Sequence, residues 1–259
     1  HGVGASAVNG LSRRFDVTVR RGGYIHTMSF RHGVPGTLDG DGPNEPFGAG
    51  PALQVVGAVK RRERTDSSMR YWYDPRYFEV GGTLDVDFVR MKLRNTAFLV
   101  PGVSYLLRNH TVADFVRDRF HYPNGLTDMV DFLAPEEDRM VSGILMVSGE
   151  GTYRENDADA NDVMQDNVAT HDEGFLAFLC SAVYERTVEC FIITIRNELG
   201  GNHRRDLLRA MIRTIFDAVR IDGDMINDME DPPTMNDILE GLTAVVHVCI
   251  QHPPFTSKT

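Results

Sequence analysis

The chain opens with His1-Gly2-Val3-Gly4-Ala5-Ser6 and continues directly into a run of small and apolar residues at 7–11. Two glycines among small residues predict a loop that leads into the N-terminus of a helix. Glycine lets the backbone approach a ligand closely, and the unpaired N–H groups at a helix start attract phosphate oxygens. The stretch is therefore a candidate phosphate-binding loop, with a plain glycine turn as the alternative.

Length and composition indicate a globular protein of one or two domains. The chain has 259 residues, of which 42% are hydrophobic and 25% charged, and its formal net charge is −10. No apolar run is long enough to span a membrane and no signal-peptide pattern is present, so we expect a cytoplasmic protein. Because the chain is acidic, any contact with nucleic acid needs a local basic patch. The cysteines, Cys180, Cys190 and Cys249, are an odd number without metal-binding spacing, and we expect them to be reduced.

Alternating apolar and polar residues predict strands along most of the chain. Residues 15–20 and 24–30 flank Arg21-Gly22-Gly23, which is typical of a β-hairpin. Further strands are expected at 53–59, 69–73, 103–107, 144–147, 175–179, 187–195 and 242–250. Residues 32–51 are rich in glycine and proline and are expected to form a loop.

Three helices and a domain boundary complete the predicted organisation. One helix is expected to end near Gly102, and a short one at 126–133 stops before Pro135. After Gly200-Gly201, a helical period places seven apolar residues on one face: Leu207, Leu208, Met211, Ile212, Ile215, Phe216 and Val219. The charged, proline-containing residues 134–138 predict a boundary between two domains.

Several short motifs follow one another in an order typical of one enzyme family. Besides the opening stretch and the hairpin, they are Arg70-Tyr71-Trp72, Ala97-Phe98-Leu99, Phe120-His121-Tyr122, Tyr184-Glu185-Arg186-Thr187-Val188, Gly200-Gly201-Asn202-His203 and Glu240-Gly241-Leu242-Thr243-Ala244-Val245-Val246. In this collinear order the chain resembles, over essentially its whole length, the ATPase subunit of bacterial type IIA topoisomerases, which comprises gyrase B and the ParE protein of topoisomerase IV. The acidic stretch within residues 150–173 resembles an insertion of actinobacterial members.

The resemblance implies an α+β and α/β architecture in two parts. Residues 1–138 would be the C-terminal part of a GHKL-type ATPase domain, including its ATP lid. Residues 139–259 would be the transducer domain, which has a fold like that of ribosomal protein S5. The implied cofactors are ATP and Mg²⁺, and the implied partners are DNA, the DNA-cleaving gyrase A or ParC protein, and a second copy bound through the ATPase domain.

The resemblance also implies which residues contact ATP. His1, Gly2, Val3, Gly4, Ala5 and Ser6 match the lid, whose backbone amides wrap the triphosphate. Ser67 stands where the family has a threonine near the adenine. Lys258 lies in the approach to the loop whose lysine reaches the γ-phosphate; it either occupies the preceding glutamine position or, with one deletion, is that lysine.

The rest of the family's hydrolytic machinery has no counterpart in the motifs of this chain. In family order, the general base, the asparagine that holds Mg²⁺ and the aspartate that reads adenine all precede the lid. The DNA-cleaving tyrosine belongs to the partner protein. The resemblance therefore assigns no catalytic residue and no metal ligand here, and we expect a fragment that is incomplete as a catalyst alone.

Several positions depart from the family pattern. Asp66 replaces a glycine, Ile193 an asparagine, Asn202 a threonine and Leu239 an arginine. Cys180-Ser181-Ala182-Val183 stands where Trp-Gly-Thr-Gly is usual. These departures bear on the coupling between ATP and the transducer, not on the fold.

Basic residues gather on the helix after Gly201, opposite its apolar face: Arg204, Arg205, Arg209, Arg213 and Arg220. A solvated face is one interpretation, since Asp206 and Asp217 lie among them. The functional interpretation is that Arg205, Arg209 and Arg213 face DNA and contact its phosphates inside the clamp.

Other patterns favour simpler interpretations. Asp157, Asp159 and Asn161 are spaced like the start of a calcium loop, but Asp162 and Val168 occupy the positions of its glycine and glutamate. A solvated insertion is therefore expected. Two functional alternatives stay open: a non-catalytic interaction module that no longer binds ATP, and a GHKL ATPase of the mismatch-repair type, which the gyrase-like motif order disfavours.

Overall fold

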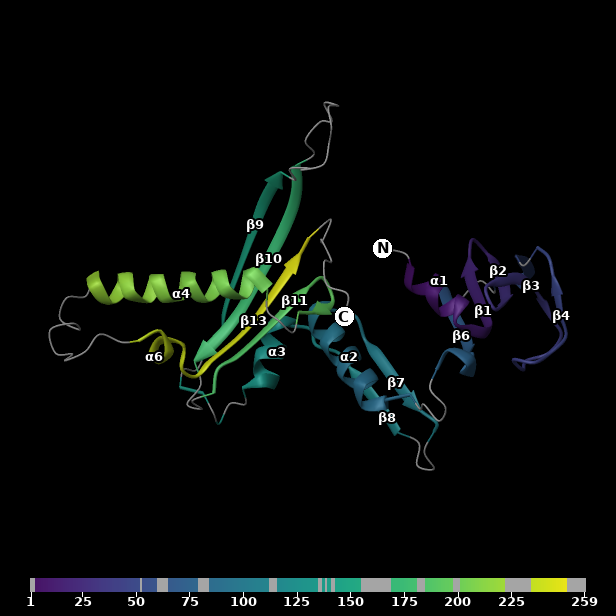
Figure 1. Ribbon diagram of the computed structural model, residues 1–259, viewed down its shortest axis with the longest axis horizontal. Coiled ribbons are helices and arrows are strands. Elements are labelled where there is room, and N and C mark those ends of the chain that lie inside the picture. Colours follow the sequence, from purple (N-terminus) through teal and green to yellow (C-terminus); the bar gives the residue numbers. More distant parts are fainter. Residues whose placement is uncertain are drawn as a thin grey trace. The chain divides into compact units, whose positions relative to one another are not determined.

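The chain divides into two compact units, His1–Leu84 and Asp85–Thr259. The computed structural model describes residues 3–51, 53–59, 65–78, 84–111, 116–134, 137, 139–140, 143–154, 169–180, 185–197, 201–221 and 234–250. Both units combine helices with sheet (Figure 1). Among the described residues, no helix has the length and apolar character needed to cross a membrane.

The first unit is a six-stranded sheet with one helix before it. The strands follow the order β4-β3-β2-β1-β6, and β5 pairs with the remaining half of β2. Their bounds, with the flanking helices, are α1 (Val3–Gly10), β1 (Ser12–Arg21), β2 (Tyr24–Arg31), β3 (Val34–Leu38), β4 (Phe47–Ala49), β5 (Gln54–Ala58), β6 (Asp66–Tyr73) and the 3-10 helix η1 (Pro75–Tyr77).

The predicted hairpin forms the centre of this sheet. β1 and β2 pair antiparallel down to Arg21 opposite Tyr24, so that Gly22 and Gly23 make the two-residue turn. Both glycines have positive φ angles, 63° and 83°, which a type I′ turn requires. The prediction from the Arg21-Gly22-Gly23 motif is confirmed.

The loop predicted for residues 32–51 was wrong in part, because β3 and β4 lie within it. β3 pairs with β2 from Ser29 opposite Gly36, and β4 pairs with β3 from Gly36 opposite Ala49. Gly36 is buried, and the Phe47 ring packs where a side chain at this position would be. Glycine and proline usually indicate a turn, but Gly36 is a strand residue because the absence of a side chain leaves space for the Phe47 ring.

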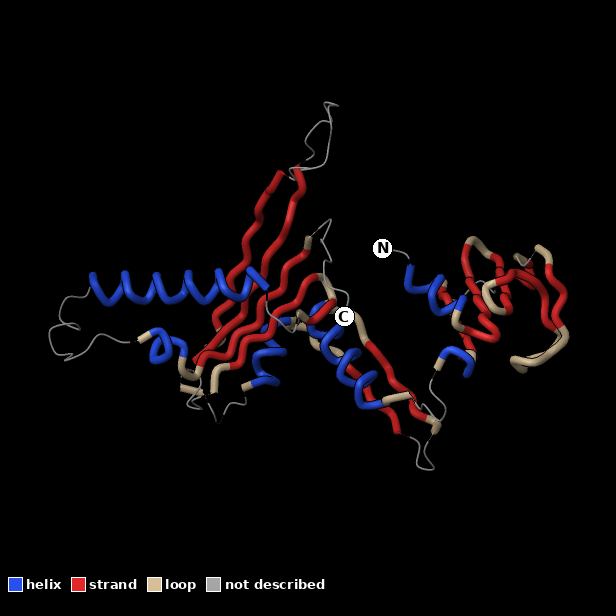
Figure 2. Tube along the Cα trace, in the orientation of Figure 1, coloured by secondary structure: helices blue, strands red, loops and turns tan. Residues whose placement is uncertain are grey.

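The second unit is built on a five-stranded sheet of order β12-β11-β13-β10-β9 (Figure 2). β11 and β13 are parallel, and the other neighbours are antiparallel. The elements are α2 (Val86–Leu99), β7 (Tyr105–Asn109), β8 (Val116–Phe120), α3 (Leu126–Leu133), β9 (Leu145–Arg154), β10 (Ala169–Cys180), β11 (Thr187–Ile192), β12 (Ile195–Arg196), α4 (Gly201–Ile221), α6 (Met235–Leu239) and β13 (Leu242–Cys249).

Alternate residues of β10 and β13 build a core on each face of this sheet. Ala177, Leu179 and Val245 pack with Phe98 of α2 and Val130 of α3. The intervening residues face α4, and this second core contains Leu176, Phe178, Leu242, Ala244, Leu208, Met211, Ile212 and Phe216. Figure 1 shows α4 lying across this face of the sheet. The predicted apolar face of α4 is therefore confirmed at Leu208, Met211, Ile212 and Phe216.

Two details of the second unit differ from the sequence predictions. The strand expected at 187–195 ends at Ile192, because Ile193 adopts a left-handed φ of 56° and turns the chain into β12. A second strand, β8, pairs with β7 although its sequence Val-Arg-Asp-Arg-Phe did not suggest one. The boundary predicted at residue 138 lies inside this unit, since α3 belongs to the core shared with β10 and β13, and it stays a prediction.

Candidate functional site

The predicted lid residues form a helix rather than a loop. Val3, Gly4, Ala5 and Ser6 make the first turn of α1, all exposed, while His1 and Gly2 lie outside the described residues. The first N–H groups of a helix have no partner within it, so this turn presents backbone donors to solvent. A Cβ atom built on Gly4 would meet nothing within 4 Å, so the surface beside it is open.

The other end of α1 is fixed to the sheet of the first unit. The Leu11 amide donates to the Ala7 carbonyl at 3.0 Å, and the Asp74 amide donates to the Leu11 carbonyl at 2.9 Å. The Ser12 hydroxyl donates to the Val8 carbonyl at 2.5 Å. These bonds tie the end of the helix to the start of β1 and the end of β6. α1 is thus anchored at its C-terminus and exposed at its N-terminus.

A buried carboxylate supports this anchor. Asp74 accepts hydrogen bonds from the backbone N–H of Arg76 at 3.0 Å and from its guanidinium Nη2 at 2.6 Å. His32 Nδ1 lies 3.2 Å from the same carboxylate. The hydrogen bonds from the Arg76 side chain lower the pKa of Asp74 to about 2, against the opposing effect of burial. The motif order did not indicate this cluster; Asp74 followed by proline, which begins η1, was the only local signal.

Ser67 lies near the start of β6, opposite Val19 of β1. It lines a shallow hollow of about 450 Å³ beside Asp66. Asp66, which stands where the family has a glycine, binds Arg20 with both carboxylate oxygens 2.9 Å from Nη1. No hydrogen bond joins Ser67 to the described residues of the predicted lid, 3–6, and Ser67 stays a predicted adenine neighbour.

The three predicted DNA-facing arginines all lie on the exposed side of α4. Their side chains are 58%, 68% and 86% exposed at Arg205, Arg209 and Arg213. Asp206 lies 3.7 Å from Arg205 and 3.9 Å from Arg209, and Asp217 lies 4.0 Å from Arg213. The face is therefore basic but partly neutralised. Lys258 and the acidic residues 155–168 lie outside the described residues.

His203 lies in the first turn of α4. Its Nε2 atom is buried with no hydrogen-bond partner among the described residues, and burial lowers the pKa of the ring. Gly201 has a φ of 53°, and a Cβ there would lie 2.9 Å from the Asn197 amide nitrogen. Burial favours the neutral imidazole of His203, and the nearby Asp206 opposes this effect.

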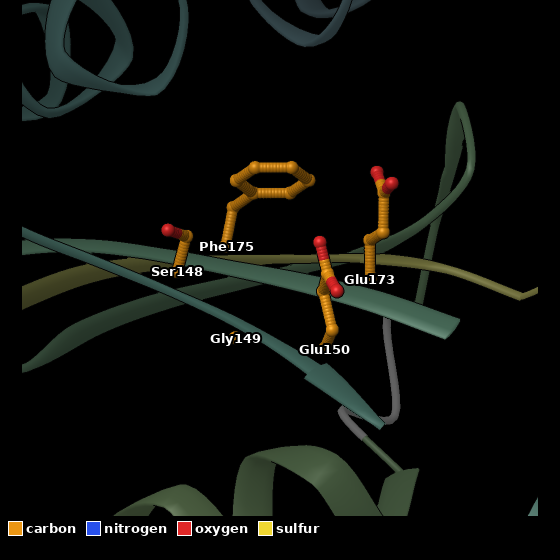
Figure 3. Close-up of a pocket in the computed structure, with 5 residues that line it drawn as sticks. All are labelled: Ser148, Gly149, Glu150, Glu173 and Phe175. Atoms are coloured by element: carbon orange, nitrogen blue, oxygen red, sulfur yellow. The ribbon is translucent and has the colours of Figure 1, made fainter. Parts of the chain in front are cut away.

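A shallow hollow of about 390 Å³ opens on the edge of the second sheet (Figure 3). Ser148, Phe175, Glu150 and Glu173 point into it, and the two glutamates are directly opposite each other on β9 and β10. Facing carboxylates repel a nucleotide phosphate, so this hollow is unsuited to ATP. Among the described residues, no group of histidine, cysteine, aspartate and glutamate side chains could hold a metal ion.

Two of the three free cysteines have thiols that resist ionisation. Burial raises the pKa of Cys190 to about 11. Burial also raises the pKa of Cys249, and the nearby Glu173 acts in the same direction. A thiol with a raised pKa is a poor nucleophile near neutral pH.

Comparison with known proteins relates the whole chain to one family. The DNA gyrase B protein of Mycobacterium tuberculosis (strain H37Rv) is 28% identical over 291 residues, covering 100% of this chain and 37% of that protein. The DNA gyrase B protein of Streptococcus pyogenes is 26% identical over 259 residues, covering 100% of this chain and 34% of that protein. The chain thus spans about a third of the length of these curated relatives.

Solved structures agree on the fold. The 43K ATPase domain of Thermus thermophilus gyrase B, solved with an aminocoumarin, superposes with a TM-score of 0.70 at 26% identity, over 98% of this chain and 59% of that chain. The topoisomerase IV ATP-binding domain of Francisella tularensis gives a TM-score of 0.65 at 18% identity, over 100% of this chain and 60% of that chain. The predicted fold class, that of the GHKL ATPase domains with mixed helix and sheet, is confirmed.

The family model for DNA gyrase B matches residues 125–259, which is more than half of the chain and includes α3, the five-stranded sheet and α4. The motif order, the solved structures and this match all lead to one assignment. The chain belongs to the DNA gyrase B family.

Proposed function

We propose that this chain is the lid-and-transducer part of an ATP-dependent type IIA topoisomerase subunit. The observation that carries the proposal is α1, whose first turn is exposed while its last turn is hydrogen-bonded to Leu11 and Ser12. Leu11 in turn accepts a hydrogen bond from the Asp74 amide. A lid must present free backbone N–H groups to the triphosphate and stay attached to the domain at its other end. Val3, Gly4, Ala5 and Ser6 would supply those donors together with His1 and Gly2.

ATP binding would close the lid and bring two subunits together as a clamp. The transducer would pass the nucleotide state to the rest of the enzyme by rigid-body movement. Ser67 would contact the adenine side of the nucleotide and Lys258 its γ-phosphate. Mg²⁺ would accompany ATP, but the described residues offer no set of ligands for it. We assign no catalytic step to a residue of this chain.

DNA and the DNA-cleaving gyrase A or ParC protein would be the working partners, in the cytoplasm. The exposed guanidinium groups of Arg205, Arg209 and Arg213 would contact phosphates of the enclosed DNA segment. Their aspartate neighbours lie at 3.7–4.0 Å, and exposed ion pairs of this kind contribute little, so phosphate oxygens can compete for the guanidinium groups.

A chimera tests the proposal. This chain would replace the matching segment of M. tuberculosis DNA gyrase B, and binding of a non-hydrolysable ATP analogue would be measured. Gly4→Val would block the close approach of phosphate and weaken binding. Gly50→Val is the matched control, because a Cβ at either glycine meets nothing within 4 Å. Equal affinities of both variants for the ATP analogue would contradict the lid assignment.

The same chimera separates the enzyme from the interaction module. With the DNA-cleaving partner present, ATP-dependent change of DNA supercoiling is expected. A chimera that melts cooperatively but binds no nucleotide would favour the non-catalytic module instead.

A further inference from the structure

The two-stranded ribbon β7–β8 has one covered face and one open face. Phe120 is buried, and Asp118 accepts a hydrogen bond from Arg90 of α2 at 2.9 Å, so α2 covers the face that carries both. Side chains alternate across a strand, and the intervening residues therefore occupy the other face. These are Leu106, Arg108, Arg117 and Arg119, and all four are exposed.

The three arginines of the open face lie next to one another; we call them the ribbon arginines. Arg108 is directly opposite Arg117, and Arg119 follows Arg117 on the same face, paired with Leu106. Like charges directly opposite each other destabilise a ribbon. An arrangement that weakens the fold suggests selection for something other than stability.

Within the described residues, these charges are not compensated by acidic groups. In the part of the chain that the structure describes, none of the ribbon arginines has a carboxylate within ion-pair distance, and Arg119 donates only to the Ser104 hydroxyl, at 3.5 Å. On α4, by contrast, each of the arginines 205, 209 and 213 has an aspartate within 4.0 Å. The whole chain carries 37 acidic and 27 basic residues, so acidic partners are plentiful elsewhere.

We propose that the ribbon arginines bind the phosphate backbone of duplex DNA. Guanidinium groups bind phosphate through two parallel hydrogen bonds, and this makes arginine suited to such a surface. Arg117 and Arg119 are two residues apart on one strand, about 6.8 Å, and Arg108 lies about 5 Å across from Arg117. Three guanidinium groups at this spacing can contact neighbouring phosphates at the same time.

The composition of the face favours the backbone of a duplex over single-stranded bases. Single strands are held by stacking their bases on aromatic rings. The ribbon's aromatic side chains, Tyr105 and Phe120, lie on the face toward α2. Leu106 is the only apolar neighbour of the arginines on the open face within the described ribbon. This surface rests on the proposed role of the protein on DNA, and it is a contact additional to the one proposed for α4.

The salt dependence of DNA affinity tests the inference. Arg108→Gln/Arg117→Gln would be compared with wild type in binding a short duplex between about 50 and 200 mM salt. Log affinity falls linearly with log salt, and each phosphate contact contributes about 0.9 to the steepness of that fall. The slope of the double variant should therefore be shallower than that of wild type by about 1.8. In the triple variant that also carries Arg119→Gln, the slope should be shallower than that of wild type by about 2.7. The variants should melt no lower than wild type, since they remove a repulsion.

Two further variants show whether any loss of DNA binding is specific to the ribbon arginines. Arg21→Gln/Arg186→Gln changes the net charge equally at exposed arginines that, within the described residues, also lack an ion pair. If this control weakens binding as much as the ribbon variant, or if wild type binds no duplex, the inference is overturned. If Arg205→Gln/Arg209→Gln/Arg213→Gln abolishes binding while the ribbon variant binds normally, the ribbon inference fails and the DNA contact of α4 stands.

Discussion

The Nε2 atom of His247 lies 2.6 Å from the carbonyl oxygen of Ile193, across 54 residues of sequence. The bond joins β13 to the turn between β11 and β12. The Ile193 amide also donates to the Val248 carbonyl at 2.8 Å. Both backbone groups of Ile193 are therefore used by β13, and they hold the turn at the end of the parallel pair.

This histidine makes stability depend on pH. Burial lowers the pKa of His247 below its usual range, and the hydrogen bond to Ile193 opposes that effect only in part. The imidazole of His247 is therefore protonated at a lower pH in the folded state than in the unfolded state, where its pKa is about 6.5. The stabilising contribution is present above that pH and declines as the pH falls toward the folded pKa.

We expect the free energy of unfolding in urea to decline as the pH falls below about 6.5. His247→Gln keeps a side-chain donor for the Ile193 carbonyl but does not titrate, so its decline should be shallower. His203, whose pKa is lowered by burial in the same way, accounts for a remaining decline. Identical pH profiles for wild type and His247→Gln would contradict the assignment.

Ile193→Asn should stabilise the protein. Ile193 holds a φ of 56°, a left-handed conformation that a β-branched residue adopts only at a cost of about 1–2 kcal/mol and that asparagine adopts more readily. The side chain is 40% exposed, so the loss of its buried apolar surface offsets part of this gain. We expect the free energy of unfolding to rise by less than about 1 kcal/mol.

Ile195→Asn is the matched control for this change. Ile195 is 50% exposed and lies in β12, with Ile192 opposite it. Asparagine is unfavourable in a strand, so this variant should be neutral or less stable. A gain of the same size at both positions would mean that the φ angle of Ile193 is not the cause.

Asp74→Asn should make the first unit less sensitive to acid and less stable at neutral pH. The pKa of Asp74 is lowered to about 2, chiefly by the Arg76 side chain, whereas the unfolded carboxyl titrates at about 3.9. Its contribution is complete above about pH 4 and disappears as the pH falls from about 4 to 2. Thermal unfolding across this range should show a smaller pH dependence in Asp74→Asn.

Asp41→Asn provides the comparison, because Asp41 is 95% exposed and lies 3.8 Å from Arg70. This variant should follow wild type at every pH. If both variants behave alike, the hydrogen bonds between Asp74 and Arg76 do not carry the acid sensitivity.

Local sequence pattern predicted the elements whose own residues carry a clear periodic or turn signal. The hairpin β1–β2 needed only its alternation and two glycines, and α4 needed only its apolar period. β8 was missed because its three central residues are all charged and show no alternation of apolar and polar side chains. Asp118 is on the covered face because it accepts a hydrogen bond from Arg90, which is 28 residues away in the sequence. The cluster of Asp74, Arg76 and His32 was missed for the same reason, since His32 is 44 residues from Arg76.

Motif order predicted which residues form the lid, but not their conformation. Glycine at positions 2 and 4 indicated a loop, while the structure begins α1 at Val3. One of the bonds that fix the helix end comes from the Asp74 amide, just beyond β6, and local sequence pattern does not contain it. For the same reason the role of the lid residues rests on the family, and their nucleotide contacts stay a prediction.

Gly36→Ala should disrupt the β3–β4 pair that the sequence did not predict. A Cβ at Gly36 would lie 2.5 Å from the Phe47 Cε2 atom and in contact with the Gly48 carbonyl. The ring is held by Arg31, whose guanidinium lies 5.2 Å from its centroid, and the carbonyl belongs to β4 itself. The carbonyl cannot move away without disturbing the pairing, and overpacking of this kind costs about 1–3 kcal/mol.

Gly57→Ala introduces the same methyl group in β5, where the nearest heavy atom is Ile25 Cδ1 at an ordinary 3.7 Å. Alanine restricts the unfolded chain more than glycine does, so this control should be neutral or about 0.5 kcal/mol more stable. Denaturant unfolding of both variants measures the difference. Equal stability would show that β3 and β4 shift apart at little cost, and that the close contact at Gly36 does not fix them.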